Sequence, residues 1–313
     1  MERLDAWDAF KHRDAERPRC LAIGAFDGIH IGHQRLIAEA CTRATQVAGE
    51  AWLLTFDPHP SRVLRPGDAP PLLTSTPHKL RLLEQTGLHG VVVHPFTRAL
   101  SRLTPRAFWA QLTAAVPGLH TVIVGGNWRF GHRAGGDVEL LRALAADDGI
   151  DVRVPDAVCW QEEPVSSTRI RQAVEAGRLA EAEAMLQRRF SLLGTVVAGR
   201  QYGRQLGFPT ANIHLQDEAR PPTGVYAVTA RFNGDTYPGA AYLGVRPTAQ
   251  GAHTHPLLEV HLFDADLDLY GRTIEVAFVE HLRPDRRFNQ PDELRRQIAR
   301  DVQQARRVLH AAS

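Results

Sequence analysis

The stretch GAFDGIHIGHQRLI, residues 24–37, decides how the first half of the chain is interpreted. It begins at the end of the apolar run CLAIG, residues 20–24, which has the length and composition of a buried strand. It leads into residues 33–48, whose amphipathic pattern predicts a helix. Gly24 and Gly28 permit a tight turn between these two elements. The stretch therefore predicts a strand–turn–helix unit that places two histidines at the start of the helix.

Short apolar runs alternate with helical patterns through the rest of this half. Strands that are continuously apolar and separated by helices favour a parallel sheet that is covered on both faces. Ligands of such sheets bind beyond the carboxyl ends of the strands, so residues 24–37 are expected at a ligand-binding edge. The further candidate strands are AWLLTF (51–56), GVVVHPF (90–96), TVIVG (121–125) and DVRVP (151–155), with helical stretches at 79–86, 106–116 and 136–146.

After Ser191 the pattern changes to strand-like segments with alternating apolar residues, interrupted by Gly, Pro and Asn. This pattern predicts a small antiparallel barrel or sandwich, followed by an amphipathic helix at about 291–310. The helical stretch 168–190 bridges the halves, so we expect one domain over residues 1–187 and another over 188–313. The candidate strands are LLGTVVAG (192–199), GVYAVTARF (224–232), TYPGAAYLGV (236–245), LLEVHLF (257–263) and TIEVAFVEHL (273–282).

The overall composition is that of a globular protein and excludes several classes. The 313 residues carry a net charge of only +2, which argues against a non-specific grip on nucleic acid or on an anionic membrane. Three widely spaced cysteines argue against a disulfide framework or a four-thiolate zinc site. No apolar run approaches the ~20 residues that span a bilayer. We expect a cytoplasmic protein without nucleic-acid or membrane partners, and the sequence leaves open whether it is a homo-oligomer.

The two histidines of the opening stretch, His30 and His33, flank Gly32 at the start of the expected helix. Helix starts present unpaired N–H groups and a partial positive charge, and both attract anions. Imidazoles at that place donate hydrogen bonds to phosphate oxygens as negative charge builds up. A cap or surface role, or a metal site lacking its third ligand, is the alternative. The pair favours a nucleotide cleft, although no Walker loop and no G-x-G-x-x-G follows a strand.

A second candidate phosphate clamp is VSSTRIR, residues 165–171. Ser166, Ser167 and Thr168 offer hydroxyl groups at an expected helix start, and Arg169 and Arg171 follow them. Hydroxyl groups, amide N–H groups and guanidinium forks together bind phosphates well. A plain helix cap with solvated arginines explains the same residues. The motif therefore supports phosphate binding only when it is considered together with the histidines.

These motifs, taken in order, resemble the family of prokaryotic bifunctional riboflavin kinase/FAD synthetases over nearly the whole chain. The resemblance implies a Rossmann-like α/β nucleotidylyltransferase domain followed by a small antiparallel β-barrel kinase domain with a C-terminal helix. The first half matches through residues 24–33, TFDPHP (55–60), GGNWRFGHRAGGD (125–137) and residues 166–171. The second half matches through GRQLGFPTANI (203–213), GVYAV (224–228), GVRPT (244–248) and LEVHLFDADLDLYG (258–271).

The resemblance implies two reactions, with riboflavin, FMN and ATP as substrates. One phosphorylates riboflavin to FMN and releases ADP, and the other adenylylates FMN to FAD and releases pyrophosphate. In adenylyl transfer the nucleophile is the phosphate of FMN, which is already anionic and needs no general base. Holding two polyanions in line and stabilising the departing charge is then sufficient. In the kinase, the ribityl hydroxyl must lose a proton, which calls for a carboxylate.

In the first half, the resemblance implies His30 and His33 as catalytic residues. It also implies that Asn127, Trp128 and Arg129 line the flavin or nucleotide cleft, although an ordinary turn accounts for those letters equally well. The residues implied to bind ATP or its phosphates are Gly24, Phe26, Asp27, Gly28, Gly32, Ser166, Ser167, Thr168, Arg169 and Arg171.

In the second half, the resemblance implies Glu259 as the catalytic base of the kinase. From the alternating pattern alone, an outward and solvated position would explain this carboxylate. Thr210 and Asn212 are implied as ligands of Mg²⁺, which prefers oxygen donors, and of the nucleotide phosphates. A simple turn after the proline is their alternative. The glycine-rich edge near the phosphates would comprise Gly199, Arg200, Gly203 and Arg204.

The chain departs from the family pattern at a few positions, none of which is assigned to chemistry. Gly126 bears on flavin or adenine contacts and Tyr242 on barrel packing, while an acidic residue is displaced to Asp285. Ala25 and Gln187 are the remaining departures. Two other functions stay open at this point. One is an adenylyltransferase for another phosphorylated substrate with a non-catalytic barrel, and the other is a non-catalytic flavin-binding protein.

Overall fold

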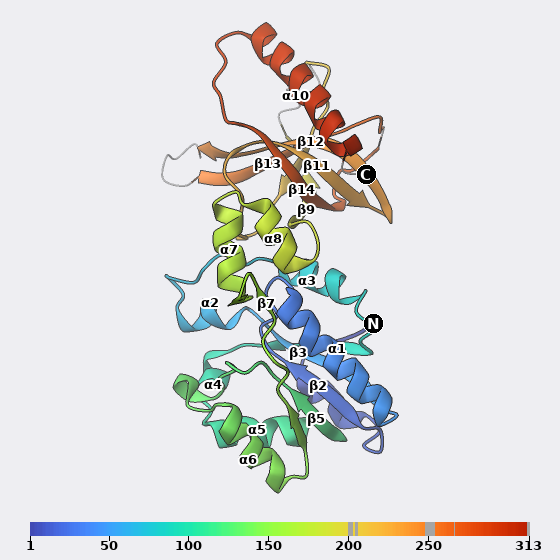
Figure 1. Cartoon of the computed structure of the whole chain (residues 1–313), viewed down its shortest axis with the longest axis vertical. Coiled ribbons are helices and arrows are strands. Elements are labelled where there is room, and N and C mark those ends of the chain that lie inside the picture. Colours follow the sequence, from blue (N-terminus) through green and yellow to red (C-terminus); the bar gives the residue numbers. More distant parts are fainter. Residues whose placement is uncertain (200–202, 204–205, 248–253, 266, 312–313) are drawn as a thin grey trace. The chain divides into compact units, whose positions relative to one another are not determined.

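The computed structural model describes residues 1–199, 203, 206–247, 254–265 and 267–311. The chain forms two compact units, shown in Figure 1. Unit 1 comprises Met1–Pro71 and Lys79–Ser167, and unit 2 comprises Leu72–His78 and Thr168–Ser313. Unit 2 thus takes a short segment from the first half of the sequence, which no local pattern indicates.

Unit 1 is built on a six-stranded sheet in which every neighbouring pair is parallel. The strand order is β1-β4-β3-β2-β5-β6, which confirms the predicted parallel sheet. Five strands lie where the apolar runs predicted them, whereas β1, in the charged N-terminal segment, was not predicted. The bounds are β1 (Glu2–Leu4), β2 (Arg19–Ile23), β3 (Glu50–Asp57), β4 (Gly90–Pro95), β5 (Leu119–Ile123) and β6 (Asp151–Arg153).

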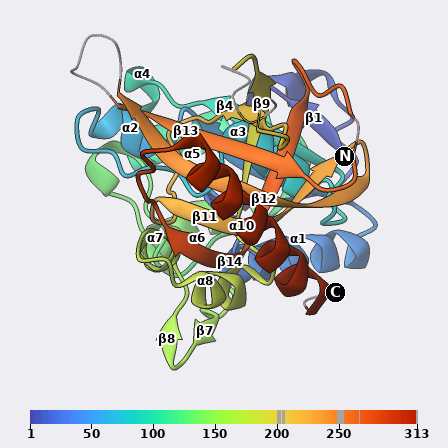
Figure 2. The same ribbon diagram turned by 90° about the horizontal axis from the view of Figure 1, so that it is seen from above.

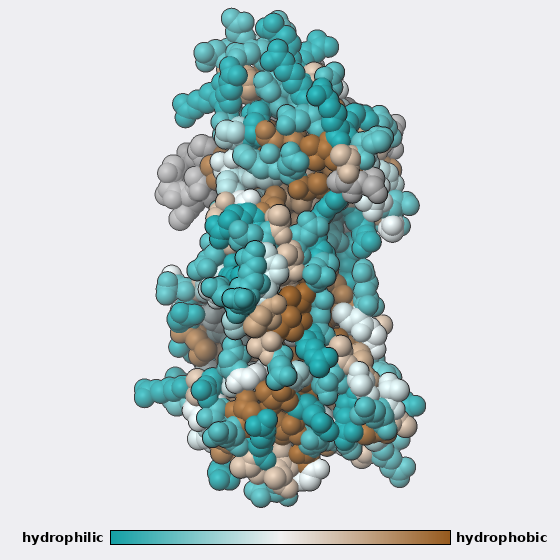
Figure 3. Space-filling view, in the orientation of Figure 1, coloured by the Kyte–Doolittle hydropathy of each residue, from teal (hydrophilic) through white to brown (hydrophobic). Residues whose placement is uncertain are grey.

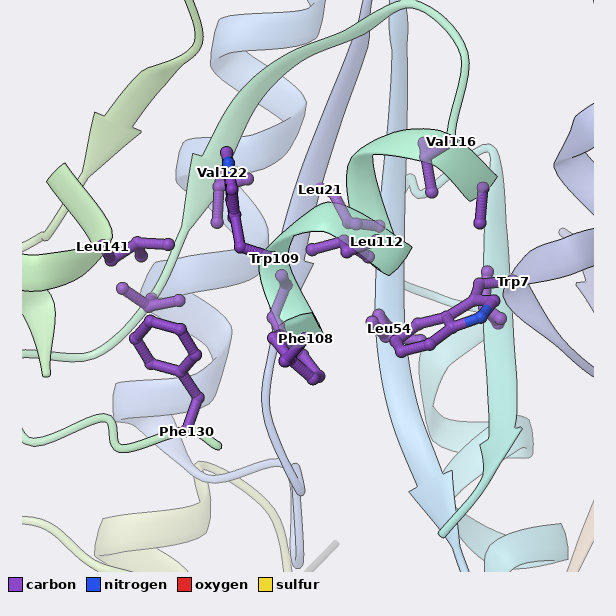
Figure 4. Close-up of a cluster of buried hydrophobic side chains, with 14 of the residues drawn as sticks. Trp7, Leu21, Leu54, Phe108, Trp109, Leu112, Val116, Val122, Phe130 and Leu141 are labelled. Atoms are coloured by element: carbon purple, nitrogen blue, oxygen red, sulfur yellow. The ribbon is translucent and has the colours of Figure 1, made fainter. Parts of the chain in front are cut away.

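The helices of unit 1 cover both faces of this sheet. On one face, Leu21 and Leu54 pack with Phe108, Trp109 and other side chains of α5, as Figure 4 shows. On the other face, the intervening strand residues pack against α1 and α3. Burial on both faces explains why the central strands β2, β3 and β4 are largely apolar. The helices are α1 (Ile31–Gln46), α2 (Pro60–Leu64), α3 (Thr76–Leu83), α4 (Arg98–Ser101), α5 (Pro105–Ala115) and α6 (Val138–Asp147), with 3-10 helices η1 (Trp7–His12) and η2 (His132–Ala134) and a hairpin of β7 (Cys159–Trp160) and β8 (Glu163–Pro164).

Unit 2 is a closed six-stranded antiparallel barrel, preceded by two helices, in the order β10-β13-β12-β11-β14-β9. The barrel of the predicted fold is therefore confirmed. Asn233 and Gly234 join β11 to β12 with φ angles of 51° and 93°, as expected of a two-residue hairpin turn. The elements are α7 (Ser167–Glu175), α8 (Leu179–Leu186), β9 (Ser191–Val197), β10 (Ala211–His214), β11 (Gly224–Phe232), β12 (Asp235–Pro247), β13 (Thr254–Leu262) and β14 (Thr273–Pro284).

The C-terminal helix α10 (Pro291–Ala311) lies across the outer face of the barrel, over β11, β12 and β14. Figure 2 shows it against these strands, and Figure 3 shows the hydrophilic side chains of its outward face. Its apolar side, including Ala305 and Leu309, packs on Ala227, Ala240 and Phe263. The predicted helix over 291–310 is confirmed. Among the residues that the structure describes, no helix has the length and apolar character needed to cross a bilayer.

Arg283 and Asp301 fix α10 to β14 through an ion pair in which Asp301 is buried and the Arg283 side chain is 20% exposed. Arg283 Nε donates to both carboxylate oxygens of Asp301 at 3.0 Å, and Nη2 donates to Oδ2 at 2.8 Å. Removing one partner of such a pair leaves a charge buried without compensation. Because Arg283 is partly solvated, we expect Asp301→Ala to lower the free energy of unfolding of unit 2 by about 2 kcal/mol.

Urea unfolding, followed in two ways, tests this expectation. All five tryptophans lie in unit 1, so tryptophan fluorescence should keep its midpoint while the far-ultraviolet circular dichroism signal of unit 2 shifts to lower urea. Asp264→Ala is the matched control, because it removes the exposed partner of Arg306 on the same helix. Equal shifts in the two variants would contradict the expectation.

Candidate active sites

The first candidate site lies at the carboxyl edge of the sheet in unit 1. β2 and β5 are neighbours in this sheet although they are not consecutive in the chain, so their connections leave in opposite directions. Such a switch point opens a crevice beyond the carboxyl ends of the two strands. Residues 24–30 follow β2, and residues 124–131 follow β5. The topology thus brings the glycine–histidine stretch and the Asn127 loop to the same crevice.

The turn after β2 is held in an unusual backbone conformation. Phe26, Gly28 and Ile29 have φ angles of 50°, 88° and 42°, a region that non-glycine residues and β-branched ones in particular avoid. Phe26 is fully buried, and a Cβ at position 24 would lie 3.2 Å from its ring. The buried Phe26 side chain therefore holds the turn in place. A phosphate-binding loop needs such rigidity.

His30 and His33 lie together at the start of α1. Their rings stack with centroids 3.6 Å apart and an angle of 21° between the planes. His30 is the N-cap of the helix, where its Nδ1 accepts a hydrogen bond from the backbone N–H of His33 at 3.4 Å. Gly32 leaves room for this arrangement, because a Cβ there would lie 3.1 Å from the His30 ring. His30 is buried and caps the helix, whereas His33 is only half-buried.

The serine-rich motif meets the same turn through one hydrogen bond. Ser167 Oγ donates to the backbone carbonyl of Asp27 at 2.9 Å. Ser166 and Ser167 belong to unit 1, whereas Thr168, Arg169 and Arg171 belong to unit 2. The structure therefore brings the serines, across about 140 residues of sequence, to the glycine–histidine stretch.

Two side chains of the loop after β5 have partners within the fold. Trp128 stacks on Phe130 with centroids 4.7 Å apart. Arg129 Nη1 lies 3.1 Å from Asp137 Oδ2, and the same carboxylate caps α6. The backbone hydrogen bond from Leu140 N to this cap is the main reason why the pKa of Asp137 is lowered. Asn127 is exposed in the crevice loop, so it is the better candidate of the three for contacting a ligand.

The second candidate site is a cavity of about 660 Å³ in unit 2, on the outer face of the barrel. One row of cross-strand partners runs through its wall: Asn212 on β10, Glu259 on β13, Tyr242 on β12, Val225 on β11 and Arg283 on β14. All five residues line the cavity. Three of them, Tyr242, Val225 and Arg283, were not predicted as site residues, because only the register of the closed barrel places them in one row.

Glu259 projects from the outer face of the barrel into this cavity. Its strand neighbours Leu258 and Val260 are buried in the interior, at 0% and 1% exposure, so the alternation of the strand directs Glu259 outward. An outward glutamate could simply be solvated, but here the cavity and α10 lie on that face. The structure thus places a carboxylate in a cavity wall that also carries an asparagine and a tyrosine.

The other wall of the cavity comes from α10 and the loop before it. Phe288, Leu294, Ile298 and Val302 form an apolar surface there. Arg283 lies over the ring of Phe288, with the guanidinium carbon 5.7 Å from the centroid. A planar aromatic ligand fits such a wall. The amphipathic pattern of the helix was visible in the sequence, but not the barrel face that it covers.

Tyr242 and Asp285, two departures from the family pattern, meet in this cavity. The Tyr242 hydroxyl is hydrogen-bonded to Asp285, and burial is the first cause of the raised pKa of Tyr242, followed by the charge of Asp285. The side chain lies over Gly244, where a Cβ would come 2.5 Å from the hydroxyl. Tyr242 therefore bears on the wall of the site as well as on barrel packing.

Thr210 is shared by the walls of the large cavity and of a smaller one. It lines both the cavity of about 660 Å³ and a second one of about 200 Å³, whose walls include Pro209, Leu267 and Tyr270. The hydroxyl of Thr210 and the amide oxygen of Asn212 are donors that suit Mg²⁺. Over the described residues, no group of three or more His, Cys, Asp or Glu side chains forms a metal cage.

Two of the four residues of the predicted glycine-rich edge can be placed. Gly199 packs directly on Asn212, and a Cβ there would collide with the amide of that side chain. A Cβ at Gly203 would lie 3.2 Å from the hydroxyl of Thr210. Both glycines thus leave room for the two predicted Mg²⁺ ligands. Arg200 and Arg204 lie outside the described residues.

Comparisons with known proteins agree with this division. The family model for FAD synthetase matches residues 12–169, and the model for riboflavin kinase matches residues 186–309. A bifunctional riboflavin kinase/FMN adenylyltransferase of Escherichia coli strain K12 is 37% identical over 287 residues, covering 91% of each chain. The enzyme of the same description from Bacillus subtilis strain 168 is 32% identical over 304 residues, covering 95% of this chain and 94% of the other.

One solved structure shares the fold over almost the full length. It is a crystal structure described as a macrolide-efflux protein from Streptococcus pneumoniae, with a TM-score of 0.81 and 27% identity. The match covers 96% of each chain. Its described role concerns that protein, and the likeness here is one of fold.

Proposed function

The chain belongs to the family of bifunctional riboflavin kinase/FMN adenylyltransferases, and from this membership we propose how its two halves divide the work. The enzyme phosphorylates riboflavin to FMN and adenylylates FMN to FAD, with ATP as co-substrate in both steps. We assign the adenylyl transfer to residues 1–187 and the kinase to residues 188–313. The matched ranges of the two family models support this boundary. We also propose a cytoplasmic location, because both steps consume ATP.

The row of partners in the cavity of unit 2 is the observation that carries the kinase assignment. We propose that the isoalloxazine ring of riboflavin lies against Phe288 and Ile298, with the ribityl chain directed toward Glu259. The oxygen of the terminal ribityl hydroxyl attacks the γ-phosphorus of ATP, and Glu259 accepts the proton that this hydroxyl loses. The bond from that phosphorus to the bridging oxygen breaks, and ADP leaves.

ATP of the kinase would occupy the smaller cavity, so that its γ-phosphate reaches the large one beside Thr210. The support is that Thr210 lines both cavities. Thr210 and Asn212 would hold Mg²⁺, which neutralises charge on the phosphates when bound. The pairing of Asn212 with Glu259 across β10 and β13 keeps the ligand and the base on one face. Gly199, Gly203 and the arginines at 200 and 204 remain the proposed edge of the phosphate site.

For adenylyl transfer, we propose the crevice beside the turn after β2. A phosphate oxygen of FMN attacks the α-phosphorus of ATP, the α–β bridging bond breaks, and pyrophosphate leaves. His33 donates a hydrogen bond to a phosphate oxygen on which negative charge develops. His30 caps α1 and holds His33 in place. The turn residues 24–28 contribute N–H donors and Ser166 a hydroxyl donor, while Ser167 holds the Asp27 carbonyl of the turn.

A time course of purified protein with riboflavin, ATP and Mg²⁺ tests the whole assignment. Chromatography should show FMN accumulating first and FAD following it. Formation of FMN without FAD would rule out the adenylyltransferase activity. If FMN is not adenylylated while another phosphate ester releases pyrophosphate, the single-activity alternative holds instead. Tight FMN or FAD binding without turnover would support the non-catalytic alternative.

A further inference from the structure

Lys79 of α3 is a buried cation beneath the turn that follows β2, in unit 1. Its side chain is only 3% exposed. The ammonium donates to the backbone carbonyl of Ala25 at 2.6 Å and to Thr55 Oγ1 at 3.1 Å. Thr55 Oγ1 in turn donates to the same carbonyl at 3.0 Å. Lys79, Thr55 and Ala25 thus form a closed triangle between α3, β3 and the turn.

A charge at this place is costly, and the hydrogen bonding of the turn does not require it. Burial of an ammonium group disfavours its charged form. The Ala25 carbonyl already accepts from Thr55, so an apolar side chain could fill the space without leaving that oxygen unpaired. The positive charge also faces the carboxylates of Asp27, in the turn, and Asp57, at the end of β3, so it offsets negative charge that would otherwise repel a phosphate at this turn.

We propose that Lys79 is a positioning residue for FMN adenylylation. Its ammonium fixes the Ala25 carbonyl, and its charge makes the turn above it attractive to the phosphates of ATP. The inference rests on the proposed placement of that reaction at the turn. A preorganised cation next to backbone donors stabilises developing phosphate charge without reorganisation at the moment of reaction. No motif contains this lysine, and the sequence shows it only as one residue of an amphipathic stretch.

The proposed role of Lys79 predicts a specific pH dependence of FAD formation. Burial lowers the pKa of Lys79 from 10.5 to about 8, and the carboxylates of Asp27, in the turn, and Asp57, at the end of β3, oppose that shift. The charge is present below pH 8 and is lost above it. FAD formation from FMN should therefore weaken as the pH rises past about 8. FMN formation by the same chain does not involve Lys79 and serves as the internal reference.

Stability changes in the opposite direction over the same interval. Between pH 8 and 10.5 the unfolded chain keeps a proton on Lys79 that the folded chain has released, so this group raises stability as the pH rises. Below pH 8 both states are protonated, and the full burial cost is present. A loss of FAD formation above pH 8 that stems from Lys79 is therefore not a loss of folding.

Lys79→Met and Lys79→Gln test the inference, the second keeping a donor without the charge. We expect each to lower kcat/KM for ATP in FAD formation by about 10- to 100-fold, to leave FMN formation unchanged, and to remove the decline above pH 8. Wild-type FAD formation in either folded variant, or an unchanged decline, overturns the inference. If neither variant keeps its tryptophan fluorescence transition, the pH profile of the wild type decides: a decline above pH 8 confined to FAD formation supports the inference, and its absence overturns it.

His33→Ala separates this inference from the placement on which it rests. If His33→Ala also leaves FAD formation intact, the reaction does not occur at this turn. If His33→Ala loses FAD formation while Lys79→Met keeps it, the placement stands and only the role of Lys79 is refuted.

Discussion

Glu259→Gln is expected to reduce FMN formation by about 10³-fold and to leave FAD formation from supplied FMN unchanged. The amide has the same shape as the carboxylate and still fits the cavity wall, but it cannot accept a proton from the ribityl hydroxyl. Glu259 stands between Asn212 and Tyr242 in the row of cross-strand partners, so the predicted ligand of Mg²⁺ stays in place. The loss should therefore appear in kcat more than in KM for riboflavin.

Two rate assays on one preparation measure this effect. FMN formation from riboflavin and FAD formation from FMN are followed separately by chromatography. Glu280→Gln is the matched control, because Glu280 is an exposed glutamate of β14 that does not line the cavity. Near-normal FMN formation in Glu259→Gln would refute its role as the base. Loss of both activities would refute separate sites.

His33→Ala is expected to show the opposite pattern, with FAD formation falling by about 10²- to 10³-fold and FMN formation retained. The substitution keeps the backbone N–H that His30 accepts, so the cap of α1 survives. Alanine is also a good helix residue. What disappears is the half-buried imidazole that we expect to contact the phosphates. The loss therefore reports chemistry and not the local fold.

The control for His33 is His120→Ala, near the amino end of β5 and so at the opposite end of that strand from the crevice. The Nδ1 atom of His120 lies 2.8 Å from Oγ1 of Thr121, and His120 has no proposed role in either reaction. We expect this variant to keep both activities. If His33→Ala makes FAD at the wild-type rate, the turn after β2 is not the site of adenylyl transfer.

The strands of the sheet could be predicted because burial on both faces leaves a local signal, a continuous apolar run. β1 could not, because Glu2–Leu4 has no such run and takes its place by pairing with β4, which lies far from it in sequence. Alternation and turn residues predicted an antiparallel barrel or sandwich for unit 2, and the family resemblance implied the barrel. Its closure, and the capture of Leu72–His78 by unit 2, depend on contacts that are distant in sequence.

The site residues also fall into two groups, those that stand in local motifs and those that are brought together only by distant contacts. His30, His33, Thr210 and Glu259 stand in local motifs, so the sequence could single them out. The cavity wall around Phe288 and the row through Tyr242 arise only when β12, β14 and α10 come together. Trp128 and Arg129 stay predicted ligand contacts, and the sequence did not reveal that Phe130 and Asp137 also contact them in the fold. Lys79 was missed because nothing near it in sequence reveals the turn that it supports.

The central claim is that this chain binds ATP at two separate places, once for attack at its α-phosphorus and once for attack at its γ-phosphorus. Isothermal titration of the flavin-free protein with ATP and Mg²⁺, at concentrations that saturate both activities, counts these places directly. We predict two ATP molecules bound per chain. A stoichiometry of one, or no binding, would contradict the account.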